Sequence, residues 1–442
     1  MALGPAAGGE GVGVVGGVGG VGDSLLHARK PAVGFIFATL LLDVIGFGLL
    51  IPVAPRLVQS LMNDGAGGTE AQAAWYYGVL IATYAAMQVL FAPILGALSD
   101  RFGRRRVLLV ALLGSGLDYF AMAFAPALWV LFLTRAINGI SGASITVCTA
   151  YIADVTPPEK RAAAFGLVGA AFGLGFIIGP VLGGFLGSID IHLPFYVAGA
   201  VTLVNWLYGC FVLPESLPPA LRRPFSLARA NPFGAFWGLG KYPLVAGMAS
   251  ALFMLNLAMF GLHATWVLYT AHRYGWNEFQ VGLSLTIVGI GAAVVQGGLA
   301  RKIIPALGPG VLGEKRALLI GMGIGVLAYV GYGAATEGWM IYAIVVAASI
   351  AGIAQPAGQA LITRTVGPSE QGAVSGALTS LQSVANILGP LIATNVFAWA
   401  ISEWAVWPLN VPGLSFFVGA VLALVGMLLA ARAVRMVGRD GA

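Results

Sequence analysis

Long apolar runs alternate with short polar breaks along the chain, and this pattern predicts the fold before any motif is considered. The runs offer 18 or more residues with no charge or a single charge. That is the length an α-helix needs to cross roughly 30 Å of hydrocarbon. Twelve such runs are present, at residues 33–60, 73–99, 105–125, 127–152, 162–188, 194–213, 243–270, 279–304, 316–334, 338–362, 372–399 and 412–434. The pattern therefore predicts an all-α integral membrane protein with twelve transmembrane helices.

The longest polar break, at residues 214–242, contains five prolines and separates the first six predicted helices from the last six. The expected organisation is a disordered Gly-rich tail at 1–30, a six-helix bundle at 31–213, a cytoplasmic central loop at 214–242, a second six-helix bundle at 243–436 and a short tail at 437–442. A signal peptide is the competing interpretation of the first segment. It lacks a basic stretch before the Val/Gly run and a Leu-rich stretch after it.

Composition excludes a water-soluble domain. Hydrophobic residues make up 59% of the chain and charged residues only 9%, against about 25% in an ordinary soluble domain. The 64 glycines suit close packing between membrane helices. Cys148 and Cys210 lie within apolar runs, without a second cysteine or a histidine at metal spacing, so we expect neither a metal site nor a cofactor.

The basic residues gather on one predicted side of the membrane. If the N-terminus is cytoplasmic, 20 of the 23 lysines and arginines face the cytoplasm, and only Arg56 and Arg273 face the opposite side. Because cytoplasmic loops are enriched in Lys and Arg, we expect both termini in the cytoplasm and the protein in the cell inner (plasma) membrane. Attraction to anionic lipid explains the net charge of +6 without nucleic acid.

The two halves repeat. Residues 158–180 and 368–390 align without gaps at an offset of 210 residues. Both segments begin with proline, carry a glycine eight positions on, and close with Gly-Pro, at Gly179-Pro180 and Gly389-Pro390. Two duplicated six-helix halves are what an alternating-access transporter needs, because rocking one against the other exposes a central site to each side in turn.

Three ionisable residues interrupt the apolar runs of the first half: Asp43, Asp118 and Arg135. Such groups are costly within a bilayer and are functional by default. A buried arginine can hold a carboxylate ionised until a proton or a cationic substrate competes for it. These residues are therefore the candidates for proton coupling, and a purely structural ion pair is the alternative interpretation.

The second half has no acidic residue within a predicted helix and offers histidine and amide side chains instead. Amides suit a hydrogen-bonding ligand surface, although they also join membrane helices to each other, and a lone histidine is often a hydrogen-bonded core group. The candidate substrate-binding residues are Asp43, Gln88, His263, Gln296, Gln355, Gln382 and Asn386.

Charge is concentrated in one short turn, GALSDRFGRRRVLL, which resembles the signature between helices 2 and 3 of the major facilitator superfamily. LTRAINGISGA resembles the helix 4 signature of that superfamily, and GLGFIIGPVLGG resembles the antiporter signature of helix 5. Stretches such as LDVIGFGLLIPVAP and WVLYTAHRYGWN are similar to the tetracycline efflux proteins among the twelve-span drug:proton antiporters. The resemblance extends over nearly the whole membrane part.

The resemblance implies a transporter that exports a small amphipathic drug in exchange for protons and works as a monomer. It places a conformational gate at Gly96, Asp100, Arg101, Gly103, Arg104, Arg105, Gly179 and Pro180. Two departures stand out. Where tetracycline exporters carry a histidine in helix 8 and an aspartate in helix 9, this chain has Ala292 and Gly325, neither of which can titrate.

Asp100 lies at the end of helix 2, where an acid is unfavourable unless Arg104 or the positive end of another helix compensates it. The start of helix 11, within 367–376, lies on the same predicted face of the opposite half. We expect Asp100 to latch the two halves closed there, on the cytoplasmic side.

Three other functions are the alternatives to drug export. A facilitator or symporter for a metabolite is one, and a non-transporting receptor or scaffold is another, because a fold does not fix a function. An enzyme is not expected, since the chain has no HExxH motif, no GxSxG beside a usable base and no cluster of metal-ligating residues.

Overall fold

The computed structural model describes residues 30–62, 68–142, 144–225, 243–365, 371–406, 408 and 410–436. This part of the chain is helical, and twelve of its helices are long and apolar enough to cross a membrane, which confirms the predicted fold class. Residues 1–29, 226–242 and 437–442 lie outside the described residues. The predicted Gly-rich tail, most of the central loop and the C-terminal tail fall there, and their boundaries stay predictions.

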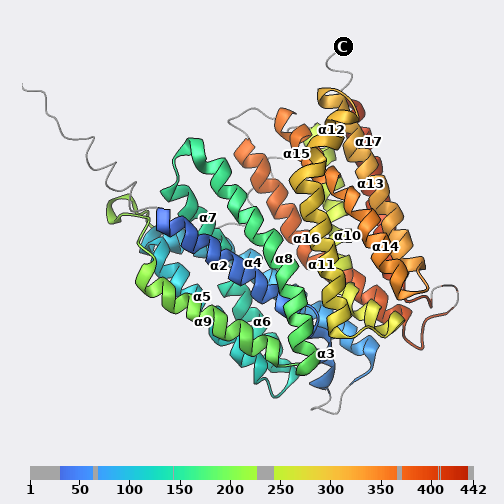
Figure 1. The fold of residues 1–442 in the computed structure, drawn as a ribbon, viewed down its shortest axis with the longest axis horizontal. Coiled ribbons are helices and arrows are strands. Elements are labelled where there is room, and N and C mark those ends of the chain that lie inside the picture. The colour runs from blue at the N-terminus through green and yellow to red at the C-terminus, as the bar shows by residue number, and fades with distance from the viewer. Residues whose placement is uncertain are drawn as a thin grey trace, which may run out of the picture.

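The first six spans run through nine helical segments (Figure 1). They are α2 (Lys30–Leu50), α3 (Ala54–Ser60), α4 (Glu70–Phe102), α5 (Arg104–Ala123), α6 (Leu128–Ser141), α7 (Ser144–Val155), η2 (Pro158–Lys160), α8 (Arg161–Ile189) and α9 (Leu193–Val212). Segments α6 and α7 form one span. A single short turn, η3 (Pro219–Leu221), follows α9.

The last six spans follow the same plan with more interruptions. They are formed by α10 (Pro243–Tyr274), α11 (Glu278–Val294) with η5 (Val295–Leu299) and α12 (Ala300–Ala306), α13 (Gly310–Ala334), α14 (Gly338–Ala348) with η6 (Ser349–Ile353) and α15 (Ala354–Thr365), α16 (Gln371–Ala400) and α17 (Leu414–Met436). Segment η5 is a π-helical turn and η6 a 3-10 turn, so spans 8 and 10 each depart from α geometry near the middle.

The first span breaks at its prolines. A turn covers residues 51–53, which include Pro52, and α3 then begins with Pro55 in its first turn. Proline has no backbone N–H to continue a helix, but it is well tolerated at a helix start. The chain therefore bends at the end of α2 and restarts as a separate short helix.

The duplicated Gly-Pro pair brings equivalent helices together in each half. A Cβ atom added at Gly179 of α8 would lie 2.8 Å from the Cα of Gly48 in α2. One added at Gly389 of α16 would lie 2.8 Å from the carbonyl oxygen of Leu257 in α10. Glycine is needed at both places because the backbones nearly touch, as they do at small-residue contacts between membrane helices. Span 5 thus packs on span 1 as span 11 packs on span 7.

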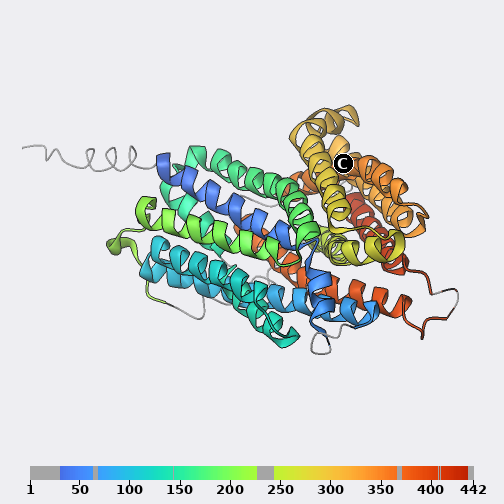
Figure 2. The same cartoon turned by 60° about the horizontal axis from the view of Figure 1, so that its bottom comes forward.

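The two halves contact each other along two helix pairs, α8 with α11 and α4 with α16. In Figures 1 and 2 the two sets of helices converge near α3 and diverge toward the ends that carry α7, α12 and α15. The helix ends of the two halves are therefore farther apart on the face of the loop between α4 and α5 than near α3.

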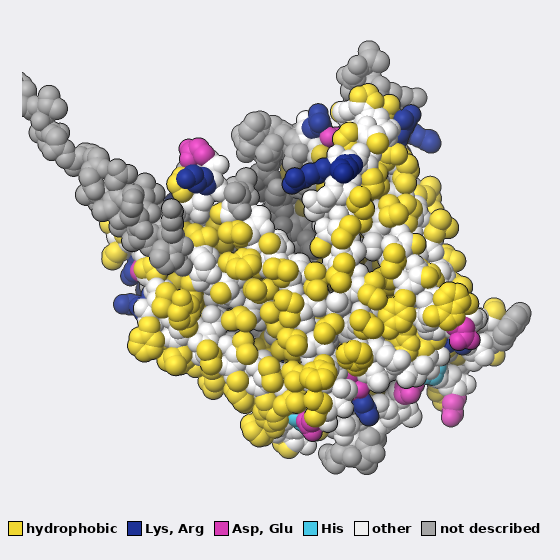
Figure 3. Space-filling view, in the orientation of Figure 1, with side chains coloured by type: hydrophobic (Ala, Val, Ile, Leu, Met, Phe, Trp, Pro, Cys, Tyr) yellow, Lys and Arg dark blue, Asp and Glu magenta, His cyan; other side chains and the backbone are white. Residues whose placement is uncertain are grey.

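The outer surface carries the apolar residues that a membrane protein needs. Large side chains such as Phe211, Val110 and Leu327 are 83%, 72% and 71% exposed. Figure 3 shows hydrophobic side chains across the middle of the molecule, with charged side chains gathered at its ends. A continuous apolar band of this kind is expected where lipid covers the protein.

Candidate functional site

A buried ion pair joins spans 3 and 4. Arg135 Nη2 of α6 lies 3.3 Å from Asp118 Oδ2 of α5, and Asn138 Nδ2 donates to the same oxygen at 2.7 Å. Asp118 is only 4% exposed and Arg135 only 8%. Asn138 lies three residues after Arg135, so one face of α6 presents both donors to the carboxylate. Two of the three predicted proton-coupling residues are thereby brought into direct contact.

Arg135 also reaches beyond its ion pair. Its guanidinium lies over the ring of Tyr84, 5.6 Å from the centroid, and Nη2 contacts the sulfur of Met122. Its Nε is buried and makes no hydrogen bond to any described residue. A buried donor without a partner is unfavourable. The Nε–H group of Arg135 can therefore still donate a hydrogen bond when the side chain moves.

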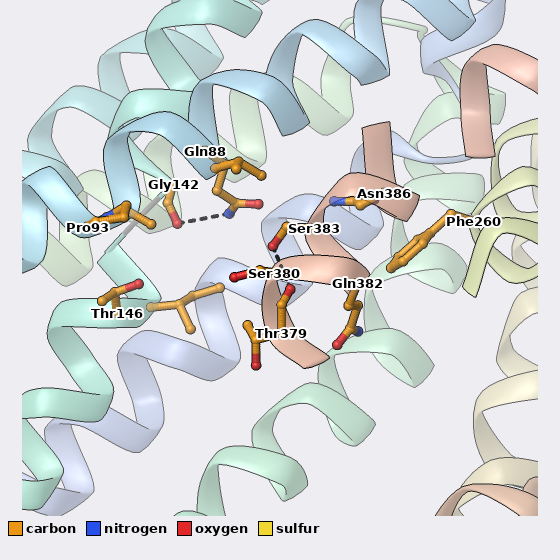
Figure 4. Close-up of a pocket in the computed structure, with 13 residues that line it drawn as sticks. Gln88, Pro93, Gly142, Thr146, Phe260, Thr379, Ser380, Gln382, Ser383 and Asn386 are labelled. Atoms are coloured by element: carbon orange, nitrogen blue, oxygen red, sulfur yellow. Dashed lines mark hydrogen bonds between the residues drawn. The ribbon is translucent and has the colours of Figure 1, made fainter. Parts of the chain in front are cut away.

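Tyr84 connects the buried pair to a cavity between the two halves. Gln88, one turn further along α4, donates from Nε2 to the Tyr84 hydroxyl at 3.4 Å and to the Gly142 carbonyl at 3.2 Å. Gln88 lines the cavity, as Figure 4 shows. The contacts therefore run without a gap from Asp118 through Arg135, Tyr84 and Gln88 to the cavity wall.

The cavity has a volume of about 450 Å³. One wall comes from α4, Gly142 and α7 of the first half, and the other comes from α16 and α10 of the second (Figure 4). Its lining residues are Gln88, Val89, Ala92, Pro93, Gly142, Ile145, Thr146, Phe260, Thr379, Ser380, Gln382, Ser383 and Asn386. Of these described lining residues none is ionisable, so the wall offers hydroxyl groups, amides and apolar surface.

The structure distributes the predicted substrate-binding residues unevenly. Gln88, Gln382 and Asn386 line the cavity. His263 does not, but it is exposed and lies three residues after Phe260 on the same face of α10. Gln296 and Gln355 are exposed in η5 and α15, outside the cavity lining.

Asp43 lies in α2 and is half-buried. It is within electrostatic reach of Tyr84 and Tyr119, and the same two tyrosines also feel the charges of Asp118 and Arg135. The third predicted proton-coupling residue thus belongs to the same neighbourhood as the buried ion pair, although it is not one of the residues that line the cavity.

A second charged cluster occupies the turn between α4 and α5. Arg104 Nη2 lies 2.6 Å from Asp100 Oδ1, its Nε lies 3.1 Å from Asp154 Oδ2, and its Nη1 donates to Ser99 at 2.5 Å. Arg104 therefore compensates Asp100, one of the two ways expected for an acid at a helix C-terminus. The other is the start of span 11, of which residues 367–370 lie outside the described residues, and the latch across the halves stays a prediction.

The other predicted gate residues shape this turn. Gly103 has φ +99°, and a Cβ atom there would lie 2.2 Å from the Glu215 carboxylate, so only glycine fits both the backbone and the space. Arg105 Nη2 donates to the Cys210 carbonyl at 2.5 Å. Arg101 is exposed beside the ring of Phe102, and Gly96 is half-buried in α4.

Glu215 was not singled out from the sequence, yet it closes the cluster. Its Oε1 accepts from the backbone N–H of Arg104 at 2.8 Å and from that of Arg105 at 3.4 Å. A carboxylate at a helix N-terminus satisfies unpaired N–H groups and is favoured by the helix dipole. Glu215 thereby attaches the start of the central loop to the first turn of α5.

The second half repeats the Arg104–Asp154 pair with the charges reversed. Glu314 of α13 pairs with Arg364 of α15, with Oε1 lying 2.9 Å from Nη2. Glu314 stands 210 residues after Arg104, and Arg364 stands 210 residues after Asp154, which is the offset that aligns the duplicated segments. Neither member of the second pair was predicted, although the offset applied to Arg104 would have led to it.

At the opposite face of the molecule, polar contacts join the two halves. Arg56 forms an ion pair with Glu278, and His272 Nδ1 contacts the carboxylate of Glu70. Deeper in the same seam, Thr286 Oγ1 of α11 donates to the Ile177 carbonyl of α8 at 2.9 Å. The halves are therefore in contact at this face, while the cavity lies toward the face of Asp100, since Gln88 and Pro93 lie in the part of α4 that approaches Phe102.

Comparison with known families identifies the architecture. Residues 36–390 match the family described as the Major Facilitator Superfamily. The chain belongs to the Major Facilitator Superfamily. Members of this superfamily are transporters rather than enzymes, so the chain is a multi-pass protein of the inner membrane that moves a small molecule across it.

Several relatives of high similarity are tetracycline resistance proteins. The class C tetracycline resistance protein of Escherichia coli is 42% identical over 391 residues, covering 88% of this chain and 94% of the relative. The class G protein of Vibrio anguillarum is 38% identical, covering 87% and 93%. The class B protein of Escherichia coli is 34% identical, covering 89% and 95%. The resemblance expected from the motifs is confirmed.

Solved structures of superfamily transporters share the fold. The crystal structure of a human organic anion transporter superposes with a TM-score of 0.66 at 25% identity, covering 91% of this chain and 99% of the other. A bacterial homologue of the human lysosomal transporter Spinster gives a TM-score of 0.70 at 18% identity, covering 96% and 99%. The predicted major facilitator fold is therefore confirmed.

Proposed function

We propose that this chain exports tetracycline, or an amphipathic drug of similar chemistry, across the inner membrane in exchange for protons. The proposal is supported by relatives named for tetracycline resistance, which align with almost the whole chain at up to 42% identity. The observation that carries the mechanism is the unbroken path of contacts from the Asp118–Arg135 pair to the cavity wall. Such a path gives a proton and a substrate a physical means of influencing each other.

The proton would act on the carboxylate of Asp118. While Asp118 is ionised, Arg135 and Asn138 both donate to it. Protonation removes the charge that holds Arg135, and an arginine left unpaired in a buried site is strongly unfavourable. Arg135 must then shift, and its contact with Tyr84 would carry that shift to Gln88 in the cavity wall.

Asp43 is the second candidate proton site. Like Asp118, it acts electrostatically on Tyr84 and Tyr119. Both belong to the first half. Ala292 and Gly325, which stand where a helix 8 histidine and a helix 9 aspartate were expected, cannot titrate. We therefore assign the proton route to the first half alone.

Substrate would bind in the cavity and bias the two conformations of the transporter. A ligand shifts such an equilibrium only through its different affinities for the two states. The cavity walls come from both halves, so a bound drug contacts both, and rocking of the halves changes those contacts. Gln88 from one half and Asn386 from the other are the amides positioned to respond.

The gate proposal rests on the charged cluster at the turn between α4 and α5. In the conformation described here the halves contact at the face of Glu70 and Glu278. When that face opens and the face of Asp100 closes, Asp100 would interact less with Arg104 and would contact the start of span 11. At the face of Asp100, α7 and α15 end in the oppositely charged Asp154 and Arg364, and this attraction favours the approach of the two helices.

We further propose that the face of Asp100 and both termini are cytoplasmic, and that the chain functions as a monomer. The orientation follows from the excess of basic residues on that face. In this orientation the halves are closed toward the outside and the cavity lies toward the cytoplasm. A drug would then enter from the cytoplasm or the inner leaflet.

Transport into everted membrane vesicles tests the proposal directly. Tetracycline should accumulate when respiration acidifies the vesicle interior, and an uncoupler that dissipates the proton gradient should abolish accumulation. Equilibration that ignores the gradient would indicate a facilitator instead. Absence of any flux, with the protein present in the membrane in normal amount, would contradict transport of this drug.

A further inference from the structure

The span 11 wall of the cavity carries closely spaced hydroxyl groups. Thr379, Ser380 and Ser383 all lie in α16 and line the cavity. Residues 379 and 383 are one helical turn apart, so they lie on the same face of the helix. Figure 4 shows these side chains across the cavity from Gln88 and Thr146. No sequence motif drew attention to them.

The protons of these hydroxyl groups are already used within the helix. Thr379 donates to the carbonyl of Ser375 at 2.9 Å, and Ser383 donates to the backbone carbonyl of Thr379 at 2.9 Å. A hydroxyl group has one proton and two acceptor lone pairs. What Thr379 and Ser383 present to the cavity is therefore acceptor capacity rather than a donor.

The facing wall has the same character. Gln88 uses its amide nitrogen to donate to Gly142 and Tyr84, as described above, which leaves its Oε1 as the polar atom available to a ligand. The described lining residues include neither an ammonium nor a guanidinium group, and the other side-chain N–H donors among them are the amides of Gln382 and Asn386. Two opposed walls thus offer oxygen acceptors to the space between them.

We propose that Thr379, Ser383 and Gln88 form an acceptor subsite that selects ligands by the hydrogen-bond donors on their polar edge. The ligand chemistry it takes is a hydroxyl, ammonium or carboxamide N–H group carried on an otherwise apolar body. The inference rests on the proposed function, since it specifies which part of the drug the cavity recognises. A ligand that lacks these donors leaves the oxygens unpaired when it displaces water, and such mismatches are strongly discriminated against.

The test compares tetracycline with an analogue in which hydroxyl and amide hydrogens are replaced by methyl groups. In vesicles containing the full chain, Thr379→Val and Ser383→Ala should each raise the half-saturating concentration of tetracycline about 3- to 10-fold. The same variants should leave transport of the methylated analogue unchanged or improve it, because each removes an oxygen atom that the analogue leaves unpaired. Thr379→Ser keeps the hydroxyl group and should raise the half-saturating concentration of tetracycline less than Thr379→Val does.

Ser250→Ala is the matched control. Ser250 of α10 donates to the Ala246 carbonyl at 2.9 Å, so it makes the same bond within a helix, but it does not line the cavity. The subsite is refuted if Thr379→Val and Ser383→Ala behave like Ser250→Ala. It is also refuted if these variants raise the half-saturating concentrations of both ligands equally.

Failure of the proposed function gives a different result. If wild-type vesicles do not accumulate tetracycline, the exporter proposal fails, and equilibrium binding to the purified protein then decides the subsite. The subsite is supported if the wild-type protein binds tetracycline at least threefold more tightly than the methylated analogue and Thr379→Val/Ser383→Ala loses this preference. Equal binding of the two ligands, or binding of neither, overturns it.

Discussion

Asp154 and Arg364 occupy equivalent ends of spans 4 and 10, 210 residues apart, and carry opposite charges. Each pairs with a residue of the preceding span, Asp154 with Arg104 and Arg364 with Glu314. The duplication has therefore conserved the position of an ion pair while exchanging its members.

Reversing a single member of the second pair should destabilise the protein, and reversing both should restore it. Arg364→Glu places two carboxylates together, one of them the largely buried Glu314. The expected cost is about 1–3 kcal/mol in the free energy of unfolding. Glu314→Arg/Arg364→Glu should recover most of that loss in a thermal unfolding experiment in detergent. A double variant no more stable than either single variant would refute the pairing.

Removing the charge of Asp118 should uncouple protons from drug. Asp118→Asn leaves Arg135 buried without its counter-ion, which should cost about 3–5 kcal/mol in stability and reduce drug-induced proton release at least tenfold. Asp43→Asn should reduce proton release with a smaller loss of stability, since Asp43 is only half-buried. Proton release measured with a pH-sensitive dye in proteoliposomes checks both, and full coupling in both variants would exclude the first-half proton route.

Arg135 offers a test of charge against geometry. Arg135→Lys keeps the charge near Asp118 but loses the planar group that lies over Tyr84. If charge alone matters, Arg135→Lys should retain much more transport than Arg135→Ala. Equal loss in the two variants, measured at matched protein levels in the membrane, would show that the contact with Tyr84 is essential.

Closure at the face of Glu70 depends on a glycine. A Cβ atom at Gly78 of α4 would lie 1.8 Å from Thr394 Oγ1 of α16, in the opposite half. Gly78→Ala should therefore separate the halves at this face and shift the population away from the conformation described here. Distances between spin labels on the two halves would report the shift, and Thr394→Ala should partly reverse it. Gly34→Ala, where the added Cβ meets nothing within 4 Å, is the control.

Much of the fold could be predicted because it follows from composition. Hydrocarbon requires helices of a minimum length, so runs such as 372–399 fix the existence of a span, here α16 (Gln371–Ala400), to within a residue or two at each end. The proline-induced bend after α2 followed from the missing N–H of Pro52. The Asp118–Arg135 contact was foreseeable because isolated charges in lipid seek partners.

The cavity was less accessible to prediction. Gln88, Gln382 and Asn386 were among the candidates, but Thr379 and Ser383 were not, because membrane helices commonly carry hydroxyl groups bonded to their own backbone. Only the packing of α16 against α4 shows which of them face the space between the halves. Glu215 was missed for a similar reason, since an acid in a polar loop carries no signal until the loop meets the start of α5.

The exchanged ion pairs also give the two halves opposite charges at equivalent positions. If two copies of the first half faced each other across a twofold axis, Arg104 would oppose Arg104 and Asp154 would oppose Asp154. With Glu314 and Arg364 in the second half, each like-charge encounter becomes an encounter of opposite charges. Duplication began with interchangeable copies, and the reversal of two residues makes each half a better partner for the other than for itself.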